Sequence, residues 1–296
     1  MFGWLSSGVI DSSRSYYSAG GAYRQIFHSK YIALNYITLR PFKTLYFSLG
    51  SSAIIADAEN LNIGYFIPIM YYTALDQSFN SQVNNAGQNS QFFFDISWDA
   101  FKMAWVYGSL FIDELRAATA FDPDEQRNII SWKLGAQSKT FTSLNFKAGI
   151  EYTQVRPGTY THYIETTNYE HAGYTMGYFS GENSDVLSLS IQAKPIPKMR
   201  VIVNLEKYRK GSVLTHSSSA KSMTGLALLS EYDQVNNFEI RIGYQLLNDV
   251  NFLIGYQSLT PSSSAIALNN YWPYIGDINA QSSHLSLINT LLTIGF

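Results

Sequence analysis

Apolar and polar residues alternate one for one in segments of about ten residues, the length of a tilted membrane-spanning strand. A period of two residues is that of a β-strand, whose successive side chains point to opposite faces of a sheet. Over residues 143–153 the apolar face reads Leu144, Phe146, Ala148, Ile150 and Tyr152. The same division recurs over 237–246, so the chain is predicted to consist of strands with one apolar and one polar face.

Short and long connections alternate between these strands. Tight turns are expected at 41–42, 99–101, 139–141, 195–198 and 248–249, whereas the connections between the resulting hairpins are far longer. Alternation alone also suits a soluble all-β fold with its apolar face turned inward. Compact soluble domains keep most loops short, whereas outer-membrane barrels combine short periplasmic turns with long extracellular loops. The pattern therefore favours an outer-membrane barrel over a soluble sheet.

No segment of the sequence predicts a membrane-spanning helix. The longest apolar run, 63–75, is interrupted by Gly64 and Pro68 and is shorter than the about 20 residues that a helix needs. The last strand, 284–296, is amphipathic and ends in Phe296, which resembles the signature that the barrel-assembly machinery reads in bacterial outer-membrane proteins. If Phe296 lies at the periplasmic side, the loop 157–183 is extracellular.

The predicted strands number eleven, and they span 30–41, 43–55, 91–99, 101–113, 129–138, 142–156, 185–195, 199–209, 237–247, 250–259 and 284–296. Single-chain bacterial barrels have even strand numbers, so at least one further strand is either undetected in this chain, with residues 16–28 as the candidate, or missing upstream. The fold class is thus all-β: an antiparallel transmembrane barrel of about 12 strands, either complete or part of a larger barrel, with long extracellular loops that carry short helices. One such helix is expected over 222–234.

Two regions are expected along the chain. Residues 1–29 form an N-terminal segment, either one strand or a fragment boundary, and residues 30–296 form the barrel. The first residues lack the basic and long apolar regions of a secretory signal peptide. The chain has no cysteine, which excludes disulfides, thiolate metal sites and thiol catalysis.

The period of two also assigns side chains to the two faces of the barrel wall. We expect the lipid-facing set to include Tyr36, Phe146, Ile240 and Ile242, and the lumen-facing set to include Lys147, Glu151 and Arg241. Inward-facing charges have mixed signs, which favours ion pairs across the lumen over a selective ion path. These charges are Asp95, Lys133, Lys147, Glu151, Arg200, Glu206, Glu239 and Arg241.

Composition narrows the function classes. Only 14% of residues are charged, against about 25% in an ordinary soluble domain, and the formal net charge is -2. No basic field is present that would bind phosphates, so nucleic acid is not expected as a partner. No glycine-rich loop stands between a strand and a helix, so no nucleotide or other cofactor is expected.

Several stretches stand in a characteristic order along the chain. They include HSKYIALNYITLRPFKTLYFSLG from His28, EYTQVRPGTYTHY from Glu151, HAGYTMGYFSGENSD from His171 and EKYRKG from Glu206. Taken in this order, they resemble the Wzi-like capsule assembly family of outer-membrane barrels. The resemblance covers residues 28–211, whereas the family's N-terminal helical part is not found in this sequence. It implies a non-catalytic, lectin-like barrel in the outer membrane of a Gram-negative bacterium that retains capsular or other surface polysaccharide.

Two aromatic loops are the candidate glycan-binding sites. Aromatic faces stack on the apolar faces of sugar rings, while neighbouring acidic and amide groups accept hydrogen bonds from hydroxyls. Aromatic residues also form girdles at the membrane interface, so single residues need not bind sugar. The candidates are Tyr160, His162, Tyr163, Tyr169, His171, Tyr174 and Glu182 in one loop, and Tyr271 and Trp272 in the other.

Catalytic and metal sites find less support. The spacing of His162 and His171 matches no helical or hairpin ligand pattern, so no metal site is expected. Serine and asparagine are so common that a hydrolase triad cannot be recognised, and no catalytic residue is expected. A passive porin or transporter is the main alternative function, and a barrel lipid hydrolase is the second. Outer-membrane lipid and, during biogenesis, the barrel-assembly machinery are the other expected partners.

Overall fold

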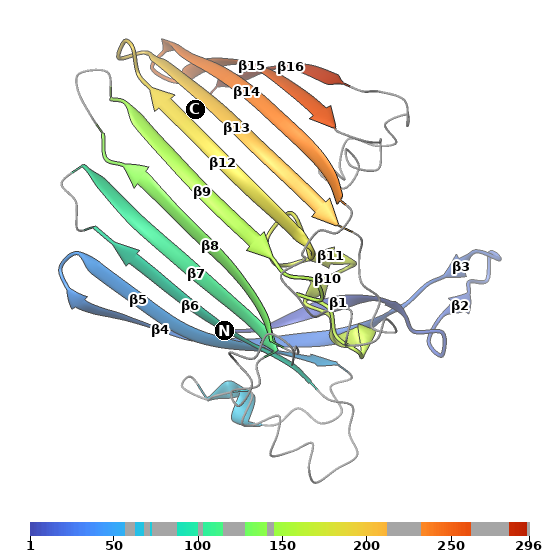
Figure 1. Cartoon of the computed structure of the whole chain (residues 1–296). Helices are drawn as coiled ribbons and strands as arrows, with labels where there is room; N and C mark the ends of the chain where they lie inside the picture. Colours follow the sequence, from blue (N-terminus) through green and yellow to red (C-terminus); the bar gives the residue numbers. More distant parts are fainter. Residues whose placement is uncertain are drawn as a thin grey trace.

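The computed structural model describes residues 1–56, 63–67, 72, 88–99, 103–114, 128–140, 145–211, 232–261 and 284–294. Within these residues, twelve strands form one curved antiparallel sheet in the order β1-β4-β5-β6-β7-β8-β9-β12-β13-β14-β15-β16 (Figure 1). The strands are β1 Phe2–Ile10, β4 Phe27–Phe42, β5 Leu45–Ala56, β6 Asn89–Trp98, β7 Ala104–Glu114, β8 Ile129–Ser138, β9 Lys147–Val155, β12 Ser184–Ala193, β13 Met199–Gly211, β14 Tyr232–Leu247, β15 Val250–Pro261 and β16 Leu285–Ile294.

Four two-residue strands and two short 3-10 helices complete the described structure. The strands β2 (Tyr16–Tyr17) and β3 (Tyr23–Arg24) pair with each other, as do β10 (Glu170–His171) and β11 (Tyr174–Thr175). The helices are η2 (Ile63–Phe66) and η4 (Glu165–Thr167). No helix in the described ranges is long and apolar enough to cross a membrane.

The predicted all-β antiparallel fold is confirmed, and each of the eleven predicted strands has a counterpart in the sheet. The prediction for the twelfth strand was wrong, because it lies at Phe2–Ile10 and pairs with β4. Residues 16–24 instead fold back on themselves through a turn in which Gly21 has a φ of 77°. A backbone of this kind suits glycine and interrupts a spanning strand.

Two local predictions also need correction. The first tight turn lies at residues 43–44 rather than 41–42, because Phe42 still pairs with Leu45 across a register irregularity that follows Leu39. A proline such as Pro41 is tolerated where the ladder is irregular, since it has no N–H to donate.

The helix expected over 222–234 is wrong at its end, where residues 232–234 belong to β14 and pair with β13. Residues 222–231 lie outside the described residues.

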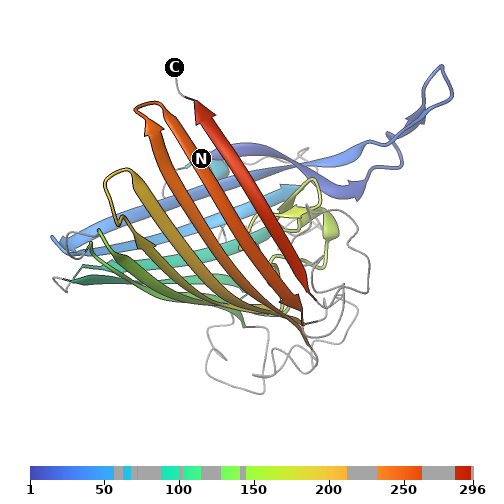
Figure 2. The same ribbon diagram turned by 90° about the horizontal axis from the view of Figure 1, so that it is seen from above.

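The sheet does not close. Viewed from above, it curves from β1 at one edge to β16 at the other, and these two strands are not paired (Figure 2). Along the outer edge of β16, no strand is paired within the described part of the chain. The twelve strands therefore form a curved wall with the strand order of a barrel and two separate edges.

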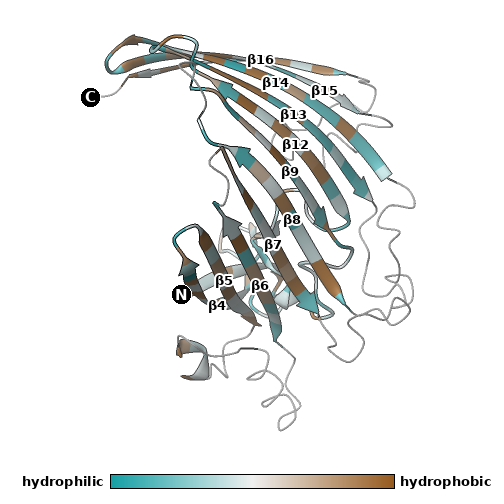
Figure 3. Cartoon of the chain, turned by 60° about the vertical axis from the view of Figure 1, so that its left-hand side comes forward, coloured by the Kyte–Doolittle hydropathy of each residue, from teal (hydrophilic) through white to brown (hydrophobic). Residues whose placement is uncertain are grey.

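The register of strand pairs assigns each side chain to one of two faces. Glu151, Glu206 and Arg241 share the inner face, which residues 156–183 cover over part of its area. Ile150, Ile240 and Ile242 lie on the outer face, as predicted, and apolar and polar residues alternate along β12 to β15 (Figure 3). Outward positions include large exposed apolar side chains such as Ile254, which is 42% exposed.

Tyr36 lies on the inner face, so its predicted lipid-facing position was wrong. It shares a side with Lys30, and its partner Gly50 pairs in turn with Phe93 on that same side. The physical reason is that β4 carries apolar residues on both faces, so its pattern does not distinguish the two sides.

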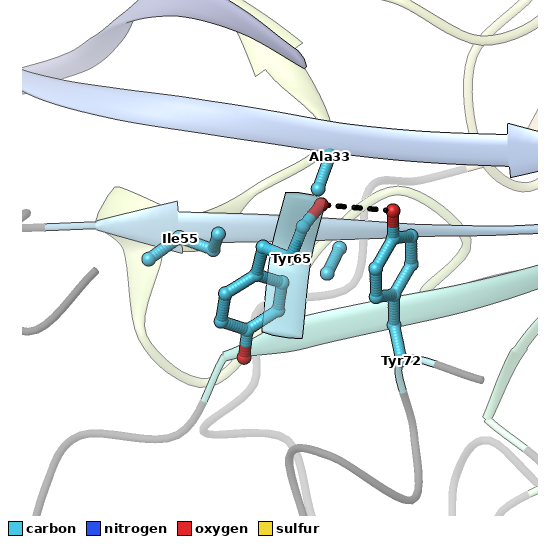
Figure 4. Packing of buried hydrophobic residues seen from close by; sticks show 5 residues of the cluster. Ala33, Ile55, Tyr65 and Tyr72 are labelled. Carbon is cyan, nitrogen blue, oxygen red and sulfur yellow. Dashed lines mark hydrogen bonds between the residues drawn. The ribbon is translucent and has the colours of Figure 1, made fainter. Parts of the chain in front are cut away.

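A small apolar cluster covers part of the outer face. Ala33, Ala53 and Ile55 of β4 and β5 are buried against Tyr65 of η2 and against Tyr72, whose hydroxyl donates a hydrogen bond to the Tyr65 carbonyl over 3.2 Å (Figure 4). The outer surface of these strands is therefore covered by the chain itself, unlike the outward positions of β12 to β15.

Replacement of Ile240 by arginine tests the outer face. We expect Ile240→Arg to lower the free energy of unfolding by about 2–4 kcal/mol if the residue lies near the bilayer midplane. Reversible unfolding from lipid vesicles is the measurement, and Ser190→Arg, on the inner face of β12, is the matched control. Equal tolerance of both substitutions would contradict the assignment of the faces.

Candidate functional site

The chain between β9 and β12, residues 156–183, folds against the inner face of the sheet, and we call it the inner loop. It contains η4, β10 and β11, and it reaches from β1 to β13 (Figure 1). Seven of the nine residues proposed for glycan binding lie in this loop, so its geometry decides which of them can contact a ligand. The other two, Tyr271 and Trp272, lie outside the described residues.

A buried lysine attaches the loop to β4. The Lys30 side chain is completely buried, and its Nζ donates a hydrogen bond to the Asn168 carbonyl over 2.7 Å and lies 3.8 Å from the Glu170 carboxylate. A second contact comes from β6, where the Asn89 amide donates to the Thr167 carbonyl over 3.0 Å. Because a buried ammonium is costly unless it is paired, these contacts favour the packed position of the loop.

The same part of the loop covers the edge of β1. The Ser6 N–H donates to His171 Nδ1 over 3.1 Å, and the Gly8 N–H donates to the Glu170 carboxylate over 2.8 Å. In return, the Ala172 N–H donates to the Ser6 carbonyl over 2.7 Å. The loop thus satisfies backbone groups that an edge strand would otherwise leave open to pairing.

Tyr160 occupies the middle of the loop and is only 7% exposed. Its φ of 76° places the backbone in a region that non-glycine residues rarely adopt. Three hydrogen bonds hold it there: its N–H donates to Asp113 over 2.7 Å, its carbonyl accepts from the Tyr169 N–H over 2.8 Å, and its hydroxyl accepts from the Tyr178 N–H over 3.0 Å. Its ring lies 5.1 Å from that of Phe111. Tyr160 is therefore a structural residue of the loop.

The far end of the loop is attached to β13 and β8. Lys210 donates hydrogen bonds to the carbonyls of Ser180 and Glu182, and the Glu182 carboxylate accepts from the Gly158 N–H over 2.7 Å. The Lys133 ammonium lies 4.7 Å from the centre of the Tyr178 ring. Two lysines from strands far apart in the sheet, Lys30 and Lys210, thus bind the two halves of the same loop.

Two apolar clusters lie where the loop packs on the inner face. Near β1, Tyr169 and Met176 of the loop pack on three buried strand residues, which are Leu5, Ile32 and Ile54. Near β13, Tyr178 and Leu285 pack on four buried strand residues, which are Val186, Tyr208, Val235 and Leu259. Burial of apolar area is worth about 25 cal/mol per Å², so both clusters favour the inward position of the loop.

The predicted site residues fall into two groups. Tyr160 and Glu182 are buried, and Tyr169 and His162 are partly buried, the last with Nδ1 2.7 Å from the Thr167 hydroxyl. These four side chains are wholly or partly covered because the loop folds onto the wall. Tyr163, Tyr174 and His171 are exposed, as is Phe179.

Lys30, Lys210 and Asp113 hold the loop but were not among the predicted site residues. All three lie in strands, and charged residues with the same face assignment are common along the sheet. The sequence offers one signal for two of them. Lys30 and Asp113 each stand next to apolar residues, near the end of a strand that the loop contacts. That signal identifies a buried charge but does not say which segment covers it.

Burial changes the protonation of several loop side chains. Removal from water raises the pKa of Tyr160 to about 12 and that of Tyr178 to about 12, and it also raises the pKa of Tyr169. Burial likewise raises the pKa of the Glu182 carboxyl, against the opposing effects of the Gly158 N–H and Lys210. Among the residues that the structure describes, no group of three or more histidine, cysteine, aspartate or glutamate side chains could hold a metal ion.

A scan against protein-family models finds no match, and a search of curated protein sequences finds none either. Among solved structures, the chain is similar to Wzi, an outer-membrane protein involved in group 1 capsule assembly in Escherichia coli and a carbohydrate-binding β-barrel. The TM-score is 0.52 at 12% sequence identity, over 92% of this chain and 52% of the Wzi chain. The chain thus spans about half the length of that protein, and the predicted resemblance is confirmed at the level of the fold.

A second structural match is OccD3 (OpdP) from Pseudomonas aeruginosa, with a TM-score of 0.32 at 9% identity over 99% of this chain and 74% of that chain. This score is too low to support an argument about fold or function. The fold that the chain shares with Wzi is that of outer-membrane β-barrels.

Gly177 provides a test of the loop packing. A Cβ at this position would lie 2.1 Å from the Tyr160 ring, whereas a Cβ at Gly20 would meet nothing within 4 Å. We expect Gly177→Ala to destabilise the packed loop by about 1–3 kcal/mol, as overpacking does, and to speed amide hydrogen exchange in residues 156–183. Gly20→Ala is the control, and equal exchange in both variants would contradict the packing described for Tyr160.

Alkaline titration provides a second test. An ordinary tyrosine has a pKa of about 10, so tyrosines released from the loop would ionise earlier than Tyr160 and Tyr178 do in place. Their stabilising effect on the loop is therefore complete below pH 10 and decreases as the pH rises toward 12. Absorbance of tyrosinate should show a late-ionising group that Tyr160→Phe and Tyr178→Phe each reduce. A folded protein that titrates like the urea-unfolded chain would contradict this.

Proposed function

We propose that the protein is a non-catalytic outer-membrane β-barrel protein of a Gram-negative bacterium that binds capsular or other surface polysaccharide through exposed residues of the inner loop. Its fold, shared with a carbohydrate-binding barrel, supports the class of protein. Outer-membrane lipid would contact the outer face, and the barrel-assembly machinery would recognise the last strand. The polysaccharide and the role in capsule assembly belong to the proposal.

The observation that carries the proposal is a rigid loop with exposed aromatic side chains. Tyr163 is 66% exposed, Tyr174 is 61% exposed and Phe179 is 56% exposed, although the loop around them is hydrogen-bonded to several strands. Large exposed aromatic side chains can stack on sugar rings, and a loop that is already ordered loses little conformational entropy when it binds. Tyr160 and Glu182 are buried, so they would hold the loop in place and would not contact the ligand.

The position of the inner loop also bears on the porin alternative. The loop lies over the inner face of the wall and is held by the Lys30 and Lys210 contacts, so it occupies space that an open channel would need. Conductance in planar lipid bilayers distinguishes the two functions. Turnover of phospholipid would support a lipid hydrolase instead.

Replacement of Tyr163, Tyr174 and Phe179 by alanine tests the proposed glycan surface. Each lost contact is worth about 1 kcal/mol, so the triple variant should bind extracted surface polysaccharide roughly a hundredfold more weakly and release capsule from cells. Protein level and heat-modifiable migration should not change, because the three side chains are exposed.

The hairpin β2–β3 offers a matched control, since Tyr16, Tyr17 and Tyr23 are exposed aromatic residues outside the inner loop. Their replacement by alanine should leave polysaccharide binding intact. Normal capsule retention by the inner-loop variant, together with measurable conductance of the unmodified protein, would favour the porin function.

A further inference from the structure

A polar surface lies on the inner face of β13 to β16, further along the same strands that carry the apolar cluster where the inner loop ends. It lines an open-sided cavity of about 550 Å³, within the range of small-molecule sites. Its polar lining includes Asn204, Glu206, Asn237, Glu239, Arg241 and Asn289. Leu253 and Leu291 add two apolar side chains to the same lining.

Hydrogen bonds between neighbouring strands fix the orientation of these side chains. The Glu239 carboxylate accepts from the Asn204 amide over 2.8 Å and from Arg241 over 2.9 Å. The Glu206 carboxylate accepts from the Asn237 amide over 2.9 Å, and Asn237 Oδ1 accepts from the Gln257 amide over 3.0 Å. A surface of amide and carboxylate groups held in this way is organised before a ligand arrives.

Gly255 creates part of the space. It pairs with Arg241 on one side and with Asn289 on the other, and a Cβ at this position would lie 2.2 Å from Asn289 Oδ1. The absence of a side chain thus lets Asn289 lie across the strand at the cavity. Arg241 also retains a buried Nε–H that has no hydrogen-bond partner among the described residues.

From this arrangement we infer that the cavity is a binding site for a neutral oligosaccharide. Amide groups donate and accept, and carboxylates accept through two oxygens, so adjacent planar groups can bind the neighbouring hydroxyls of a sugar ring. Leu253 and Leu291 offer apolar contact to the C–H groups of the ring. Two glutamates against one arginine leave an excess negative charge, which disfavours acidic sugars.

This inference rests on the proposed function in taking a glycan as the ligand, but it assigns a different site. The exposed aromatic residues of the inner loop would form an outer subsite, and the cavity on β13 to β16 would form an inner one. Because the two sites share no residue, each can be removed without changing the other.

The experiment uses the full chain folded in detergent micelles and measures binding by isothermal titration calorimetry. The probes are maltohexaose, which is neutral, and a hexamer of galacturonic acid, which is acidic. We expect maltohexaose to bind at least tenfold more tightly than the acidic hexamer. Equal binding of both probes, tighter binding of the acidic one, or binding of neither would overturn the inference.

Gly255→Ala should weaken maltohexaose binding at least tenfold, because the new Cβ displaces Asn289. Gly243→Ala is the matched control, since Gly243 lies on the same inner face and a Cβ there would meet no atom closer than 3.9 Å. If Gly255→Ala fails to fold, Asn289→Ala with Asn251→Ala as its control makes the same comparison. Unchanged binding in the cavity variant would overturn the inner site.

The triple inner-loop variant separates the two proposals. If it loses surface polysaccharide but keeps maltohexaose binding, and Gly255→Ala does the reverse, both sites are supported. If maltohexaose binding is lost in the inner-loop variant and unaffected by Gly255→Ala, the inner site is overturned while the proposed function stands. If polysaccharide binding is unaffected by the inner-loop variant and maltohexaose binding is lost in Gly255→Ala, the proposed surface fails and the inner site stands.

Discussion

The attachment of the inner loop to two distant strands is the interaction on which the rest of the structure depends. A curved sheet whose edges are not paired has no closed ladder to maintain its curvature. Lys30 of β4 and Lys210 of β13 bind successive parts of one loop, and the strands between them form the wall that the loop covers. Lys30 is buried under the loop and Lys210 is partly buried, so release of the loop would break hydrogen bonds from two charged donors, which are stronger than those between neutral groups. The loop and the wall therefore stabilise each other.

This mutual support explains why aromatic residues of one loop have two roles. Tyr160 and Tyr169 pack against Phe111. Tyr160 also has a positive φ, and its contacts must offset the unfavourable free energy of that backbone conformation. Tyr163 and Tyr174 come from the same loop, but their side chains are exposed. The proposed glycan surface would therefore be ordered before a ligand arrives, which favours tight binding by a few stacking contacts.

Strand positions could be predicted from the sequence because the alternation in β9 or β14 has one clearly apolar face. The same reasoning failed for Tyr36, since β4 is apolar on both faces, and it missed β1, whose run FGWLSSGVI alternates weakly. It also did not indicate that Tyr160 and Glu182 are buried. A loop has no period, so its composition indicates aromatic chemistry but not which side chains face the wall. That outcome depends on long-range partners such as Lys30 and Asp113, which local sequence does not identify.

The inner face is divided by polarity, and this division connects the loop with the cavity. Apolar inner-face residues such as Ile32 and Val235 lie where Tyr169 or Tyr178 packs on them. Beyond this area, the inner face of β13 to β16 carries amides and carboxylates that are bonded to one another. Polar groups in such a surface require water or a hydroxylated ligand at their remaining hydrogen-bonding positions. An inner loop that extended further along these strands would cover those groups and exclude water from them. The polar part of the wall therefore lies where the loop does not cover it.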